Sequence, residues 1–319
     1  MFYFRNGKRV GQQQAGILIG LCLLVVLTYL CRIFSMALNQ FWKRKNGDKS
    51  EMSFVDHLEV LRAHLFRSVV AIAVGAVIAG IYEKFIIKQI LLGPTQSNFP
   101  TYGVICRIGQ SLNLGNALCM EGIPVRMQST NVSGQFSMWF TVILVSGLII
   151  AFPYVFYQFW SFIRPALSKK ELNKTSGVIF WVSFLFFTGV SFGYFVVAPY
   201  ALNFFYHFQL DEIVENIWTI NSYIDMMLPI CLGSGLAFQL PLVIFFLAKI
   251  GLVTATYLRK VRKYAVVIIF IIAAIITPGP DVISQLAVAM PLLLLYEISI
   301  ILTRRVEKQR AEEDEKEWS

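Results

Sequence analysis

The chain has 319 residues, of which 56% are hydrophobic and only 15% are charged, and its mean hydropathy is +0.63. Water-soluble globular proteins carry about a quarter charged residues, so this composition excludes that class. The formal charge of +9 does not indicate nucleic-acid binding, because Lys and Arg gather in short segments between apolar runs. The chain is therefore predicted to be an integral membrane protein.

Seven apolar runs have lengths that suit membrane-spanning helices. Such a helix needs about 20 apolar residues, because lipid offers no partner for free backbone groups. One run over 15–37 precedes six core runs, and the last two core runs are short; a helix over 264–277 covers only about 21 Å. The six core spans are predicted over Phe66–Tyr82, Met138–Phe159, Val178–Phe205, Tyr223–Ile250, Tyr264–Thr277 and Leu286–Leu302.

Basic residues mark every second loop. Lys and Arg gather on the cytoplasmic side of membrane proteins, so we expect six core spans with both ends in the cytoplasm. The basic clusters are Lys43, Arg44, Lys45, Lys49, Arg62 and Arg67, then Arg164, Lys169, Lys170 and Lys174, then Arg259, Lys260, Arg262 and Lys263, and finally Arg304, Arg305, Lys308 and Arg310.

The run over 15–37 is predicted to be an additional span with an outside N-terminus. A cleaved signal peptide is one alternative, because small residues end the run, but cleavage would invert every later loop. Initiation at Met52 is another alternative. We predict three segments: an extra transmembrane segment and basic linker over 1–50, a six-span membrane domain over 51–305, and a charged cytoplasmic tail over 306–319.

Enzyme signatures are missing from the sequence. His57, His64 and His207 are assigned to loops or helix ends, so they assemble neither an HExxH zinc site nor an intramembrane nucleophile and base pair. The five cysteines have no metal-binding spacing. Cys106 and Cys119 share one polar loop, where a disulfide can form if that loop faces an oxidising compartment. We expect no catalytic residue, no metal and no cofactor.

Two polar residues inside the predicted spans are candidates for helix docking. Glu297 is expected to face a partner, a cavity or the headgroup boundary, because a carboxylate facing lipid is costly. Gln239 either bonds to backbone freed by Pro241 or docks another transmembrane helix. Kinks are predicted at the prolines inside spans, Pro153, Pro199, Pro229 and Pro291.

Two acidic residues stand among basic neighbours on the predicted cytoplasmic side. Glu59 lies in an amphipathic stretch that leads into the first core span, and Glu171 lies in the first inner loop. A pair of carboxylates suits a peptide that carries guanidinium groups, because Arg binds carboxylate through two parallel hydrogen bonds. The alternative is ordinary solvated charge, balanced by Arg62 or Lys170.

Several motifs follow one another in order along the core spans. They are Ser53–Arg62, Pro153–Leu167 closed by Glu171, Gly193–Pro199, Phe238–Pro241, Leu258–Tyr264 and Thr277–Gln285, with Glu297 behind. Together they resemble the TatC subunit family of the twin-arginine protein translocase, over about Met52–Arg305. No single motif is specific, but their order and the predicted topology agree with that family.

The resemblance implies an all-α integral membrane fold, a glove-shaped bundle of six helices, to which this chain adds one N-terminal transmembrane helix. Its cytoplasmic face would bind the paired arginines of a signal peptide. Glu171 matches the family's inner-loop glutamate, with Phe162 and Pro165 nearby. The family's other glutamate falls where this chain has Val60. Either the helix presents Glu59 instead, with Arg62 beside it, or the second contact is weakened; Glu59 lies about 100° round the helix from that position.

The resemblance also implies partners and a location. Gln239 stands where many relatives carry glutamate, at a site implicated in docking single-span subunits, and Gln285 and Glu297 are assigned to the same role. The implied partners are twin-arginine signal peptides of folded cargo, TatA- and TatB-type subunits, the lipid bilayer and other copies of the chain, with no nucleic acid. The implied location is the bacterial cytoplasmic membrane, with a cytoplasmic C-terminus. The proton-motive force would drive export of folded proteins.

A secondary transporter of a small solute is the alternative function. Such transporters contain internal repeats and ionisable residues near the membrane midplane. The sequence shows no convincing repeat, and Glu297 is the only carboxylate that we place well inside a span. Uptake of a solute by the purified chain in liposomes would support this class. An intramembrane enzyme is disfavoured further by the lack of a nucleophile and base pair.

Overall fold

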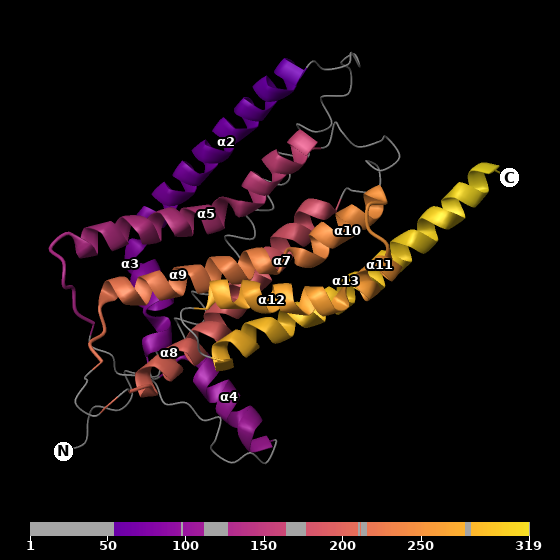
Figure 1. The fold of residues 1–319 in the computed structure, drawn as a ribbon. Helices are drawn as coiled ribbons and strands as arrows, with labels where there is room; N and C mark the ends of the chain where they lie inside the picture. Colours follow the sequence, from indigo (N-terminus) through magenta and orange to yellow (C-terminus); the bar gives the residue numbers. More distant parts are fainter. Residues whose placement is uncertain are drawn as a thin grey trace, which may run out of the picture. The chain divides into compact units, whose positions relative to one another are not determined.

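The computed structural model describes residues 54–96, 98–111, 127–163, 177–209, 211, 216–277 and 282–318. The chain divides into two compact units, Met1–His57 and Leu58–Ser319. The predicted front span over 15–37 lies outside the described residues. Within the described ranges the chain is almost entirely helical (Figure 1), and its only β feature is an isolated bridge between Gln128 and Thr219. The predicted all-α membrane fold class is confirmed.

Five helical stretches of the described chain are long and apolar enough to cross a membrane. A sixth helix, α12 (Arg262–Ile276), has 15 residues and covers about 22 Å, so it is short, as predicted. The five stretches are Glu59–Ile81 within α2 (Phe54–Ile81); α5 (Gly134–Ile163); Val178–His207, made of α7 (Val178–Phe192), η4 (Gly193–Val197) and α8 (Ala198–His207); Ile220–Ile250, made of α9 (Ile220–Ala237) and α10 (Leu240–Ile250); and Val282–Gln309 within α13 (Val282–Trp318).

The last span is not short, which corrects the prediction over Leu286–Leu302. Helix α13 continues to Trp318, and its candidate span alone has 28 residues. The apolar run ends near Leu302, but Arg304 and Arg305 are good helix formers and continue the helix beyond it. Hydropathy therefore marked the end of the apolar run and not the end of the helix.

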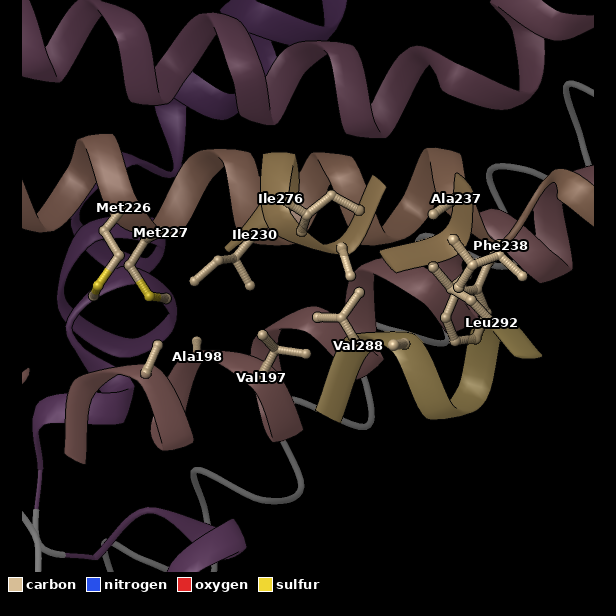
Figure 2. Packing of buried hydrophobic residues seen from close by; sticks show 14 of the residues in the cluster. Val197, Ala198, Met226, Met227, Ile230, Ala237, Phe238, Ile276, Val288 and Leu292 are labelled. Carbon is tan, nitrogen blue, oxygen red and sulfur yellow. The ribbon is translucent and has the colours of Figure 1, made fainter. Parts of the chain in front are cut away.

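Helix α9 lies at the centre of the packing and touches α7, α5, η4 and α12. Figure 2 shows buried side chains of α9 among those of η4, α12 and α13, with Ile230 of α9 near Val197 and Ile276. Ile230 and Val197 are fully buried. Because lipid tails are as apolar as these side chains, close packing rather than escape from water stabilises such contacts.

Short segments lie between α2 and α5, and tyrosine hydroxyls form hydrogen bonds with their backbone. They are α3 (Glu83–Phe85), η1 (Ile86–Leu91), η2 (Gly93–Thr95) and α4 (Pro100–Ser111). Burial raises the pKa of Tyr102 to about 12, so its hydroxyl stays protonated and donates. The tyrosine hydroxyls donate to backbone carbonyls as follows: Tyr102 to Pro94, Tyr194 to Ile90 at 2.6 Å, and Tyr223 to Leu91.

Tyr223→Phe is expected to lower the free energy of unfolding by about 1–3 kcal/mol, because the buried Leu91 carbonyl loses its donor. The unfolding temperature of the purified protein in detergent measures this effect. Tyr82→Phe is the control, since Tyr82 is exposed and its hydroxyl makes no hydrogen bond within the described chain. Equal unfolding temperatures for the two variants would contradict the prediction.

Breaks and bends in the spans have local causes. Helix α5 changes direction along its length (Figure 1) and contains Pro153, where a kink was predicted. Pro199 is the second residue of α8, the helix that directly follows the π-helical segment η4. Helix α10 ends at Gly251, whose φ of 85° favours glycine, and Leu252 N donates to Leu247 O at 2.9 Å to close the cap.

Candidate functional site

Helices α2 and α5 are tied at three levels along their lengths. Near the start of α5 a tryptophan bonds to a carboxylate of α3. At mid-length two glycines meet so closely that a Cβ on either would lie within 2.5 Å of a backbone atom of the other helix. Near the end of α5, a histidine of α2 forms the third tie, a hydrogen bond with a glutamine of α5. The pairs are Trp139 Nε1 with Glu83 Oε2 at 2.6 Å, Gly75 with Gly147, and His64 Nδ1 with Gln158 Oε1 at 2.6 Å.

The three ties define one antiparallel register. His64 and Gly75 are eleven positions apart, as are Gly147 and Gln158; the next step is again equal, eight positions from Gly75 to Glu83 of α3 and from Trp139 to Gly147 of α5. One turn beyond His64, the same register brings Val60 level with Phe162. The ring of His64 also meets the ring of Phe162, with centroids 6.5 Å apart in an edge-to-face arrangement.

The register places two predicted site residues at the same end of two adjoining spans. Glu59 is exposed near the start of α2, and Phe162 is half-buried near the end of α5. Pro165 and Glu171 lie outside the described residues and follow Phe162 by three and nine positions. Arg62 is also exposed on α2. Among the described residues Arg62 forms no ion pair with Glu59, so the simple charge balance between them is not observed.

His64 and Gln158 are members of this site that the sequence analysis missed. His64 was assigned to a loop or helix end, which is wrong, because it lies inside α2 and inside the candidate span Glu59–Ile81. Its half-buried ring contacts α5, and Gln158 is only 3% exposed. The signal was available in the spacing: Val60 and His64 are four residues apart, so they share a helix face.

Gln239 lies at the break between α9 and α10 and bonds to backbone of two helices. Its Nε2 donates to Val182 O of α7 at 3.2 Å and to Gly235 O of α9 at 3.5 Å. Its buried Oε1 has no partner in the described part of the chain. Gln239 thus bonds to backbone, but neither carbonyl is the one that Pro241 frees.

The other two predicted docking residues lie apart on α13. Gln285 Nε2 donates to Phe270 O of α12 at 3.1 Å. Glu297 pairs with Arg262 at 2.8 Å, and both side chains are about half exposed. Twelve residues of helix, about 18 Å, separate Gln285 from Glu297, so the structure does not bring the three docking candidates into one cluster.

The described chain also includes a cysteine in a disulfide and an exposed carboxylate inside a span. No cluster of three His, Cys, Asp or Glu that could hold a metal occurs in the ranges that the structure describes. Cys106 is in a disulfide, and its predicted partner Cys119 lies outside those ranges. The sequence analysis overlooked Asp225, an exposed carboxylate five residues into the span Ile220–Ile250. Asp225 makes no ion pair with a described residue.

The fold and this site define a polytopic helical membrane protein whose polar side chains tie helices together and line helix ends. Residues 56–291 match the family described as Sec-independent protein translocase protein (TatC). The chain belongs to the TatC family and is a component of a Sec-independent protein translocase.

Relatives and solved structures support this assignment. The TatC protein of Blattabacterium sp. subsp. Periplaneta americana is 36% identical over 83% of this chain and 99% of its own length. The TatC protein of Desulforapulum autotrophicum is 37% identical over 84% of this chain and 90% of its own length. A crystal structure of the twin-arginine translocase receptor TatC is 33% identical, covers 79% of this chain and 99% of its own, and has a TM-score of 0.60.

Proposed function

We propose that this chain is the translocase receptor for twin-arginine signal peptides. The carboxylates of Glu171 and Glu59 bind the paired guanidinium groups, with Arg62, Phe162 and Pro165 beside them, because planar guanidinium forms two parallel hydrogen bonds with a carboxylate. The observation that supports this site is the register of α2 and α5. It sets Glu59 and Phe162 at the same end of adjoining spans. Glu171 follows Phe162 by nine positions in the chain.

The receptor acts at the cytoplasmic face of the bacterial inner membrane. The start of α2 and the end of α5 share one side, and the C-terminal part of α13 carries the basic residues Arg304 and Arg305. Basic residues favour the cytoplasmic side, so the C-terminus is cytoplasmic in this proposal. The proton-motive force drives passage of the folded cargo, and no chemical bond of the cargo changes.

Single-span subunits of the TatA and TatB type dock on the membrane-facing side of the bundle. Glu297 is the most accessible of the docking candidates, because its carboxylate is about half exposed beside Arg262. Gln239 and Gln285 hold backbone carbonyls of their own chain and shape the surface that the partner helix meets. Other copies of the chain complete the complex.

Glu171→Gln is expected to weaken binding of a twin-arginine peptide at least about tenfold, because a charged hydrogen-bond pair is lost. Binding of the peptide to the purified protein and export of a folded reporter measure the effect. A peptide with two lysines in place of the arginines should bind the wild type more weakly than the twin-arginine peptide does.

Asp225→Asn is the matched control, since it also removes an exposed carboxylate but lies at the opposite end of the spans. It should bind and export as the wild type does. Full export by Glu171→Gln, or equal binding of the two peptides by the wild type, would reject the proposed function.

A further inference from the structure

The imidazole of His64 is held in one orientation at the edge of the proposed peptide site. Its Nδ1 lies 2.6 Å from Gln158 Oε1. Gln158 is 3% exposed, so packing limits its movement. The edge of the ring also meets Phe162, with centroids 6.5 Å apart. Two neighbours on α5 therefore position the imidazole from one side.

The hydrogen bond with Gln158 also sets the tautomer. An amide oxygen only accepts, so His64 Nδ1 must carry the hydrogen. In the neutral ring the other nitrogen, Nε2, then has a free lone pair and accepts a hydrogen bond. His64 makes no hydrogen bond from Nε2 within the described residues, although the ring is only half buried. His64 Nε2 is therefore a hydrogen-bond acceptor that is held in place and has no partner among the described residues.

This acceptor lies on the side of α2 that adjoins Phe162 of α5. Val60 and His64 are four residues apart and share the side of α2 that meets Phe162, whereas Glu59 points about 100° away from Val60. Val60 offers no acceptor to a peptide on that side. His64 Nε2 does.

We propose that His64 is a recognition residue that accepts a hydrogen bond from a guanidinium group of the signal peptide through Nε2. This inference rests on the proposed function and deepens it. A guanidinium has five N–H groups in a planar fork, so one group binds a carboxylate through two of them and still donates a third to the imidazole. The compact, strongly hydrated ammonium of lysine fits this arrangement less well.

Two substitutions separate this role from a purely structural tie between α2 and α5. His64→Asn keeps a polar atom near the position of Nδ1, where its amide nitrogen can donate to Gln158, but it removes the acceptor at Nε2. His64→Gln places its amide oxygen near the position of Nε2 and gives up the bond to Gln158. Both variants are neutral and are checked for folding by yield and unfolding temperature.

Binding of a twin-arginine peptide and of its twin-lysine version to the purified full chain tests the proposal. We expect His64→Asn to bind the twin-arginine peptide about tenfold more weakly, with little change for the twin-lysine peptide, and His64→Gln to retain most of the wild-type affinity. Wild-type affinity of His64→Asn, or equal losses for both peptides, would overturn the role of His64. Failure of the wild type itself to prefer arginine would instead reject the proposed function.

Discussion

Gly147→Leu is expected to abolish accumulation of folded, export-competent protein. A Cβ at Gly147 would lie 2.4 Å from Ala76 N and 2.7 Å from Ala76 Cα, and backbone atoms cannot move aside as a flexible side chain can. The two helices would have to separate, which would also strain the ties at both ends, at an expected cost of about 3 kcal/mol or more. The yield of monodisperse protein in detergent and export of a folded reporter measure the loss.

Gly80→Ala is the control for this substitution. Gly80 also lies on α2, but a Cβ there would meet only Ile143 Cδ1 at 3.8 Å, which is an ordinary contact. We expect wild-type yield and export from Gly80→Ala. If Gly147→Leu accumulates to the same level, the close approach of α2 and α5 is not required for folding.

Arg262→Gln is expected to destabilise the protein more than Glu297→Gln does. The two side chains pair at 2.8 Å where α12 begins. Without Arg262 the short Glu297 carboxylate stays at membrane depth without its partner, at a cost of about 1–3 kcal/mol. Without Glu297 the long Arg262 side chain extends to the headgroups, so we expect a cost under about 1 kcal/mol. Unfolding temperatures in lipid nanodiscs measure the difference.

The double variant Arg262→Gln with Glu297→Gln should recover most of the stability that Arg262→Gln loses, because no lone carboxylate remains. Lys308→Gln serves as a surface control; its pair with Glu312 spans 3.7 Å and is largely exposed, so removal should cost under about 0.5 kcal/mol. A double variant as unstable as Arg262→Gln alone would show that the lone charge is not the cause.

Apolar run length predicted the spans well, because the bilayer demands it. The first five expected core spans all correspond to described helices, including the short α12. Hydropathy did not predict the end of the last helix, because a helix that leaves the membrane no longer needs apolar residues. Helix α13 continues to Trp318 through charged residues that lie beyond the apolar run.

The candidate site was predicted in part. Chemical type selected Glu59 and the family resemblance selected Phe162, and the structure places both at the same end of adjoining spans. Helical spacing put His64 on the same face as Val60, but its hydrogen bond with Gln158 was not predictable, because the two residues are 94 positions apart in the chain. Gln239 likewise reaches Val182, a backbone atom that no local pattern could have identified.

Ties at three levels make α2 and α5 a mechanical unit. Neither helix can slide past the other unless all three contacts break together. A displacement of α5 at Gln158 is therefore resisted by α2 as well, because the two helices are joined on both sides of Pro153. Binding of a ligand at one membrane surface can therefore shift the ends of these helices at the other surface.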